Sequence, residues 1–122
     1  MRFVIQHHAG KDEHYDLMIE QSDADALLTW KIGLADMNLL LSGSHVNAER
    51  LADHRKEYLD YEGPVSKGRG SVRIFDRGEC TPLTEKDNAS GFMLEGRKLA
   101  GNIMLKKNEN GFFTISYSAK QE

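Results

Sequence analysis

The first sixteen residues contain three side chains whose types and spacing could bind a metal ion. His14 and Asp16 stand two residues apart in "HYDLMIE", an alternating run that predicts a β-strand with both side chains on one face. His8 ends the preceding strand-like run, and a hairpin through the loop "AGKDE" would bring it back to the same point. Two imidazoles and one carboxylate suit Mn²⁺, Zn²⁺ or Fe²⁺ and leave positions for water and substrate. Such residues often only hydrogen-bond within a strand, so that alternative stays open.

A second pair, His54 and Tyr58 in "DHRKEY", could engage a phosphate group. The two residues lie one turn apart if the segment is helical, or at the two ends of a turn. Both side chains can donate to a phosphate oxygen, and a histidine can also act as a general acid. The alternative is a partly buried tyrosine beside an exposed histidine.

The elements that would position these groups are mostly short strands. Strand patterns cover 2–8, 14–20, 26–32, 71–83, 91–95, 99–107 and 112–118, with two strands expected around an Asp-Arg-Gly turn in "SVRIFDRGECTPL" and a hairpin turn at Gly96. This spacing predicts a mainly β fold, a small closed or nearly closed β-barrel of about eight strands with one or two short helices. We expect a single domain over residues 1–122.

The segment 46–61 is the exception to the strand pattern. Asn47 could cap a helix in which Leu51, His54 and Tyr58 share one face, and local propensity favours that helix. A strand leading into a turn is the alternative.

Composition narrows the functional class. The chain has 122 residues, 39% of them hydrophobic and 29% charged, with a net charge of −3. A protein that covers phosphates broadly should be basic, so any contact with nucleic acid is expected to be local. The longest apolar run is too short to span a membrane, and the single cysteine, Cys80, cannot form an internal disulfide. These features favour the reducing cytoplasm.

Five motifs in order resemble the 3′-phosphoesterase domain family of DNA ligase D, including its stand-alone members. They are "FVIQHHAGKDEHYDLMIE", "TWKI", "LADHRKEYLDYEG", "SVRIFDRGECTP" and "GFMLEGRKLAGNIMLKK". The resemblance implies a β-barrel that holds a divalent cation, most often Mn²⁺, with Zn²⁺ or Co²⁺ as alternatives. It also implies removal of 3′-phosphates, or of 3′-ribonucleosides by phosphodiester cleavage, during DNA end repair.

Site roles follow from the same resemblance, position by position. The matching positions are His8, His14 and Asp16 for the metal, His54 and Tyr58 for the scissile phosphate, and Gln6 beside the site. The resemblance further implies action on DNA or RNA/DNA primer 3′ ends, alongside a separate DNA ligase, polymerase or Ku-type end-binding protein. We expect a monomer with no membrane association.

One departure from the family puts activity in question. Met18 stands where the family places an arginine that clamps phosphate, and a thioether cannot make that contact. Lys11, Lys67 and Arg69 are the candidate replacements. The alternative function is a catalytically weak or inactive family member that acts as a nucleic-acid or repair-partner binding module. The sequence also starts at the first expected strand, without the family's leading segment, and we expect this to disfavour monoesters relative to diesters.

Overall fold

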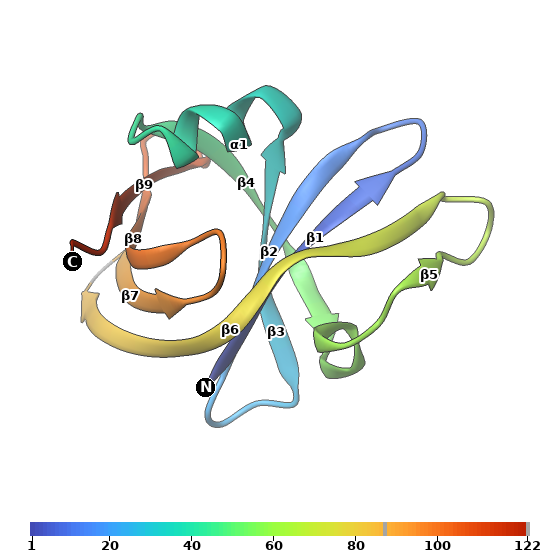
Figure 1. Ribbon diagram of the computed structural model, residues 1–122, viewed down its shortest axis with the longest axis horizontal. Helices are drawn as coiled ribbons and strands as arrows, with labels where there is room; N and C mark the ends of the chain where they lie inside the picture. The colour runs from blue at the N-terminus through green and yellow to red at the C-terminus, as the bar shows by residue number, and fades with distance from the viewer. Residues whose placement is uncertain (87, 122) are drawn as a thin grey trace.

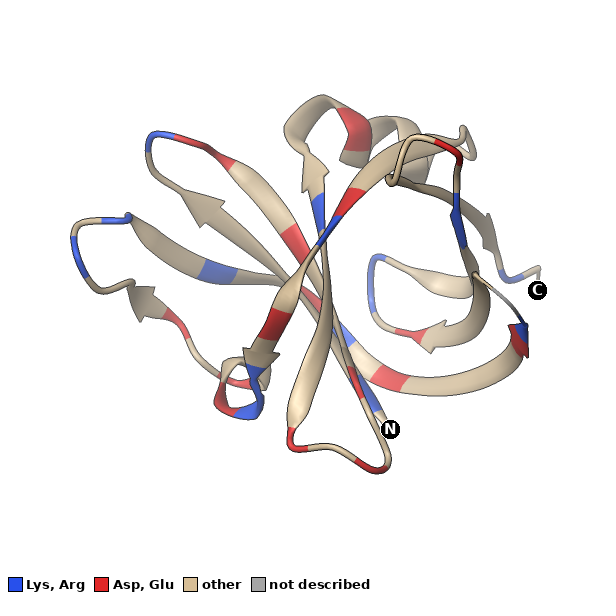
Figure 2. Cartoon of the chain, turned by 180° about the vertical axis from the view of Figure 1, so that it is seen from behind, with Lys and Arg blue, Asp and Glu red and all other residues tan. Residues whose placement is uncertain are grey.

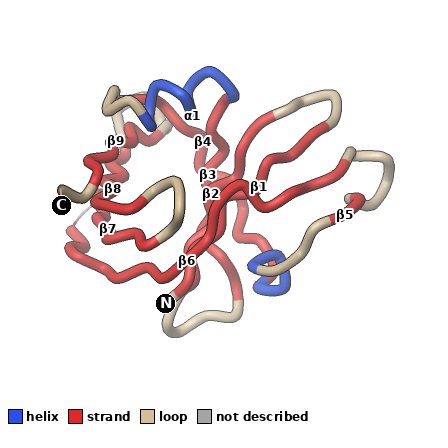
Figure 3. The backbone as a smooth tube through the Cα atoms, in the orientation of Figure 1, coloured by secondary structure: helices blue, strands red, loops and turns tan. Residues whose placement is uncertain are grey.

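The structure, a computed structural model, describes residues 1–86 and 88–121 and is built mostly of β-strands. The strands are β1 (Arg2–Ala9), β2 (His14–Glu20), β3 (Ala26–Gly33), β4 (Val46–Arg55), β5 (Gly63–Pro64), β6 (Ser71–Lys86), β7 (Ala89–Glu95), β8 (Ala100–Lys107) and β9 (Phe113–Ala119). The helical segments are α1 (Leu34–Leu41) and the 3₁₀ turn η1 (Lys56–Leu59), which lie far apart in Figure 3.

Within the described residues, the strands form one sheet in the order β1-β2-β3-β4-β9-β8-β7-β6-β5, and β1 also pairs with β6. This extra pairing returns the sheet to its first strand, so eight strands form a ring that excludes the short β5 (Figure 1). The predicted mainly β fold, a nearly closed barrel of about eight strands, is confirmed. None of the helical segments described is long and apolar enough to cross a membrane.

The interior of the ring holds the larger of two apolar clusters. Period-two alternation sends Phe3 and Ile5 of β1, with Leu17 and Ile19 of β2, into this cluster, where each is at most 1% exposed. Burial of this many apolar side chains is the main favourable contribution to folding. Because one face of the β1–β2 hairpin packs into the core, polar side chains can lie on its other face.

That other face holds the outer apolar cluster, which we define as Val4, Met18, Leu27 and Leu59. All four side chains are at most 3% exposed. Register pairs Val4 with Met18 across the β1–β2 hairpin, and Leu59 comes from η1. The outer apolar cluster therefore fastens η1 to the hairpin.

The helix predicted over 46–61 is wrong. Residues 46–55 form β4, which pairs with β3 and β9, and only the following four residues are helical, as η1. Val46 and Ala48 are buried while Asn47 is exposed, a period-two pattern that serves a strand. Cross-strand pairing on both sides outweighed the local helix propensity of the segment. The structure matches the alternative of a strand leading into a turn.

The predicted break in "SVRIFDRGECTPL" is also wrong. β6 runs through it without interruption, pairing with β1 as far as Glu79 and with β7 from Glu79 onward. Gly78 is needed for close packing: a Cβ there would lie 2.0 Å from the carbonyl oxygen of Glu95. The predicted hairpin turn at Gly96, between β7 and β8, is confirmed.

Candidate metal centre

The loop end of the β1–β2 hairpin carries the three predicted ligands. Register pairs His8 with His14 and Gln6 with Asp16, so these side chains leave one face as neighbours. The hairpin that sequence reasoning required is confirmed. The β5–β6 loop lies against the same end, and both loops project together in Figure 1.

The donor atoms of these three residues converge. His14 Nε2 lies 3.1 Å from Asp16 Oδ1, and His8 Nδ1 lies 3.9 Å from Asp16 Oδ2. One donor atom from each residue lies within 4.8 Å of the others. Among residues 1–86 and 88–121, this is the one group of three or more metal-ligating side chains that meets so closely.

The remaining ring nitrogens are held by backbone carbonyls. His14 Nδ1 donates to the Asp12 carbonyl at 2.6 Å, and His8 Nε2 donates to the Arg69 carbonyl at 2.6 Å. A carbonyl oxygen can only accept, so each neutral ring carries its hydrogen there. The free lone pairs are then on His14 Nε2 and His8 Nδ1, the two nitrogens that face Asp16. Hydrogen bonds of this kind, from the ring nitrogen that does not bind the metal, orient histidine ligands.

The Asp16 carboxylate supplies an independent test of whether a cation fits. Its Oδ1 is buried and accepts no hydrogen bond from the part of the chain that the structure describes. A buried carboxylate oxygen left unpaired is costly. Without a cation or proton between them, that oxygen faces a nitrogen lone pair of His14. Asp16 raises the pKa of the His14 imidazole above its usual value, against the opposing effect of burial. A positive charge is favoured at this point, and the donor set fits a divalent cation.

A pocket of about 300 Å³ opens beside these donors. It is lined by His8, Lys11, Asp12, His14, Gly68 and Arg69. Of the three cations that sequence reasoning named, Lys11 and Arg69 therefore border the centre. Lys67 belongs to the same β5–β6 loop but does not line the pocket. Figure 2 shows basic residues in both projecting loops, beside acidic residues in the β1–β2 loop, and the charged residues that line the pocket are Lys11, Arg69 and Asp12.

Close packing holds the β5–β6 loop in place. A Cβ on Gly70 would lie 1.8 Å from the carbonyl oxygen of Ala9, so only glycine permits this approach of the two backbones. The Arg69 guanidinium donates to the carbonyl and hydroxyl oxygens of Ser66, at 3.0 and 3.1 Å. The Arg69 carbonyl is thereby held where His8 can reach it.

Lys31 and Asp12 are site residues that sequence reasoning missed. Register pairs Lys31 of β3 with Asp16 of β2, and the Lys31 ammonium forms an ion pair with the Asp12 carboxylate. Asp12 raises the pKa of Lys31, so this side chain stays cationic. The signal in the sequence was the β2–β3 register. Counting outward along both strands from the loop that joins them pairs Lys31 with Asp16.

His54 and Tyr58 lie farther along the sheet from the ligands, since His54 pairs with Leu27 and Leu27 with Glu20. Gln6 lies between them and Asp16. The His54 and Tyr58 rings pack edge to face with centroids 5.8 Å apart. Gln6 is 1% exposed and donates to the carbonyls of Tyr58 and Tyr61, at 3.0 and 2.9 Å. Gln6 thus ties η1 to the strand position opposite Asp16. The structure brings His54 and Tyr58 together but does not bring them into contact with the ligand donors.

Met18 occupies the space between these two groups. It lies on the ligand face of β2, two residues beyond Asp16, and is 0% exposed within the outer apolar cluster. Its burial explains how a thioether is accommodated at this position: it packs and makes no polar contact.

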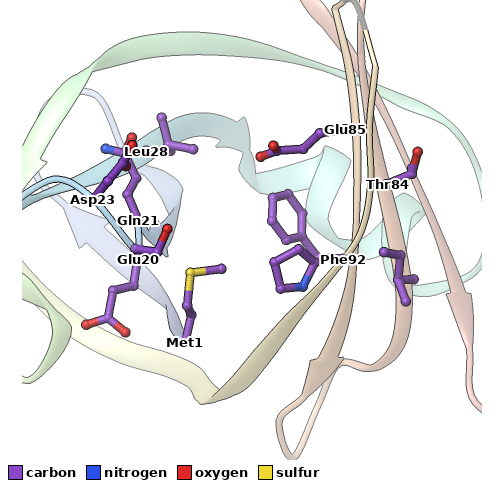
Figure 4. A pocket seen from close by; sticks show the side chains of 11 residues that line it. Met1, Glu20, Gln21, Asp23, Leu28, Thr84, Glu85 and Phe92 are labelled. Carbon is purple, nitrogen blue, oxygen red and sulfur yellow. The ribbon is translucent and has the colours of Figure 1, made fainter.

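A larger hollow lies at the opposite end of β2 and holds none of the predicted site residues. Its volume is about 510 Å³, and Figure 4 shows Glu20, Asp23 and Glu85 around an apolar floor that includes Leu28 and Phe92. Carboxylates repel a phosphate, so size alone is a poor guide to the site in this molecule.

Comparisons with known proteins identify the family of this chain. The family model described as the DNA Ligase D 3′-phosphoesterase domain matches residues 6–107, a range that includes every residue discussed above as a ligand or a neighbour of one.

Curated relatives are similar to this chain over most of its length. One is the multifunctional non-homologous end joining protein LigD of Pseudomonas aeruginosa, 32% identical over 110 residues, which cover 83% of this chain and 12% of that protein. The corresponding LigD proteins of Mycobacterium bovis and Mycobacterium tuberculosis are 30% identical over 131 residues, covering 98% of this chain and 16% of theirs. The chain therefore spans less than a fifth of the length of these curated relatives.

Proposed function

Because the chain belongs to the DNA ligase D 3′-phosphoesterase family, we propose that it is a metal-dependent phosphoesterase that acts on 3′ ends of nucleic acid during DNA end repair. The observation that carries this proposal is the convergence of donor atoms from His8, His14 and Asp16, with one buried carboxylate oxygen that has no hydrogen-bond partner among the described residues. A purely structural cluster has no physical need for this arrangement.

The family resemblance makes Mn²⁺ the proposed metal, with Zn²⁺ or Co²⁺ as alternatives. Two imidazoles and one carboxylate are intermediate between hard and soft ligands, and they leave coordination positions for substrate and water. When bound, such a cation offsets charge on a phosphate oxygen and lowers the pKa of a coordinated water.

The chain's own cations and hydrogen-bond donors would hold the ester. Lys11 and Arg69 border the pocket, and Lys31 stands beside it in its ion pair with Asp12. Neutralising charge that builds up on phosphate oxygens accelerates ester hydrolysis. These three cations are the proposed substitutes for the arginine that Met18 replaces.

His54 and Tyr58 would act on the ester from the side away from the ligands. His54 Nδ1 donates to the Ala52 carbonyl at 3.0 Å, which leaves Nε2 available to a substrate. A protonated His54 can supply the hydrogen that the departing 3′-oxygen needs, and the Tyr58 hydroxyl can donate to a second phosphate oxygen. Gln6 fixes the backbone of this pair and acts as a positioning residue.

The second candidate function is a non-catalytic module that binds nucleic acid or a repair partner. The observation in its favour is Met18, which fills with packed apolar atoms a position where the resemblance expects a phosphate clamp. Under either function, the proposed partners are DNA or RNA/DNA primer ends and a separate DNA ligase, polymerase or Ku-type protein.

The deciding experiment is hydrolysis of a primer–template whose 3′ end carries either a phosphate or a single ribonucleotide, with and without Mn²⁺. We expect metal-dependent loss of the end group, abolished in His14→Ala. His45→Ala is the matched control, since this exposed histidine lies outside the site and should leave activity unchanged. Comparing the two ends also shows whether a monoester or a diester is hydrolysed faster.

Calorimetric titration with MnCl₂ separates the two functions. Binding that depends on His14 without any turnover would favour the module. Absence of both binding and turnover would overturn the metal centre itself.

A further inference from the structure

A small pocket beside the candidate metal centre is lined by aromatic and charged side chains, among them Arg55 and its ion-pair partner Glu57. Its volume is about 210 Å³, and it is lined by Arg55, Glu57, Tyr58, Tyr61, Pro64 and Ser66. This space suits one planar ring system and is too small for a whole nucleotide. Nothing in the proposed hydrolysis uses Arg55 or Tyr61.

The side chains of this pocket are those that stack on nucleobases. The Tyr58 and Tyr61 rings meet edge to face with centroids 5.7 Å apart, and the Arg55 guanidinium lies 5.9 Å above the Tyr58 ring. The Arg55 side chain is 74% exposed, and Tyr61 is 37% exposed, so both can be reached from solvent. Aromatic faces combined with arginine form sequence-tolerant platforms for unpaired bases.

The pocket is rigidly connected to the metal centre. Gln6 donates from one side-chain nitrogen to the carbonyls of both Tyr58 and Tyr61, and it stands opposite Asp16 in the hairpin. This single buried amide therefore couples the backbone of the aromatic pocket to the strand position of a metal ligand.

One loop separates the two pockets. Ser66 lines the aromatic pocket and Arg69 lines the metal pocket, and the two residues are joined by the hydrogen bonds from the Arg69 guanidinium. Lys67 lies between them on the same loop. A strand crossing this loop would meet positive charge between a base site and a phosphate site.

We infer that the pocket formed by Arg55, Tyr58 and Tyr61 binds the base next to the scissile phosphate, so that the preferred substrate is an unpaired 3′-terminal nucleotide. The inference rests on the proposed function, because the metal centre defines which phosphate is meant. A base held between these side chains cannot remain stacked in a duplex.

The test is binding, which needs no turnover. Two fluorescein-labelled single-stranded DNA octamers with a 3′-phosphate are compared by anisotropy in EDTA, one with a normal terminal base and one with an abasic terminal residue. We expect the normal end to bind about 10-fold more tightly at the same salt concentration. Equal affinities would overturn the inference.

Variants test whether the side chains of this pocket cause the preference for an end with a normal base. Tyr61→Ala and Arg55→Ala should each reduce it, whereas Tyr61→Phe, which keeps the ring, should retain it. Phe112→Ala is the matched control, because Phe112 is an exposed aromatic residue outside both pockets. Circular dichroism verifies that each variant is folded, and Arg55→Ala removes an exposed side chain that the fold does not need. A preference that survives both Tyr61→Ala and Arg55→Ala would also overturn the inference.

Hydrolysis of the same two octamers with Mn²⁺ keeps the two proposals apart. Cleavage without any preference for a base would leave the phosphoesterase standing and remove the base pocket. Base-dependent binding without cleavage would support the pocket and contradict the phosphoesterase.

Discussion

Two buried aspartates, on the two strands that flank β1, have opposite hydrogen-bonding environments. Asp76 of β6 is 5% exposed, and its two oxygens accept the backbone N–H groups of Arg97, Lys98 and Leu99 at 2.8–3.0 Å. Asp16 of β2 is 3% exposed, yet its Oδ1 accepts no hydrogen bond from the described residues.

The difference separates a structural carboxylate from one that is available to a ligand. Three backbone N–H donors replace the hydrogen bonds to water that Asp76 loses on burial, and the same hydrogen bonds hold the β7–β8 turn in shape. Asp16 faces two imidazole nitrogens whose hydrogens are directed elsewhere, so its compensation is incomplete. A bound cation would supply the missing partner. Breaking each carboxylate in turn should therefore affect different properties.

The largest effect is expected from Asp16→Asn. The amide keeps the shape of the side chain but removes a charged ligand. Mn²⁺ affinity should therefore fall by more than the roughly 10- to 100-fold that is lost when a ligand loses its hydrogen-bond partner. At pH 8 the metal-free variant should be at least as stable as the wild type, because a buried, partly unpaired charge has been removed. Calorimetry measures the affinity and urea denaturation the stability.

The matched ligand variant is His14→Ala, which should lose Mn²⁺ to a similar degree. If Asp16→Asn instead destabilised the metal-free protein strongly and bound Mn²⁺ normally, Asp16 would be a structural carboxylate like Asp76.

The second effect is expected from Asp76→Ala. Removal of the carboxylate leaves backbone N–H groups at the β7–β8 turn without partners, and Leu99 N–H is buried, so the free energy of unfolding should fall by about 2–3 kcal/mol. Mn²⁺ affinity should not change. Urea denaturation with a parallel Mn²⁺ titration measures both, and weaker metal binding in a folded Asp76→Ala protein would contradict the division of roles.

These two aspartates also mark how far sequence reasoning reaches. Asp16 was placed correctly because its neighbours within eight residues, His8 and His14, lie on one local hairpin set by period-two alternation. The role of Asp76 depends on donors 21 to 23 residues away, so its local sequence predicted a turn where the strand continues. Local patterns determine which face a side chain takes, but not which distant backbone it meets.

The same limit explains the other errors. The helix expected at 46–61 ignored the pairing of β4 with β3 and β9, which no local pattern displays. The Lys31–Asp12 pair depends on the β2–β3 register, and α1 was not predicted because "LADMNLLL" carries only a weak helical pattern: just Met37 and Leu40 are buried. The ligand roles themselves, and those of His54 and Tyr58, stay predictions.

A smaller effect should come from Lys31→Met. This variant tests whether the surroundings of Asp16 attract an anionic substrate. Loss of this cation should raise KM for a 3′-phosphate end by a few-fold, on the order of 3–5, since it is partly exposed and Lys11 and Arg69 remain. Steady-state kinetics at low and high salt measure the change, and the difference from wild type should shrink at high salt. Lys98→Met, on the Asp76 side, is the control and should leave KM unaltered.

The smallest effect concerns Cys80, which lies four residues beyond Asp76 on β6 and shows a third way to bury an ionisable group. It is 1% exposed, and burial raises its pKa from 9.0 to about 11, so the folded thiol stays neutral. As pH rises above 9, the unfolded thiol loses its proton while the folded one does not, so unfolding is favoured. Relative to Cys80→Ala, the wild type should lose on the order of 1 kcal/mol of stability between pH 8.5 and 10. Urea denaturation at both pH values measures this loss of stability.

A labelling experiment tests the burial of Cys80 directly. Iodoacetamide should label the folded protein slowly at pH 8 and the urea-unfolded protein rapidly. Fast labelling of the folded protein would show an accessible, ionised thiol and contradict the neutral burial of Cys80.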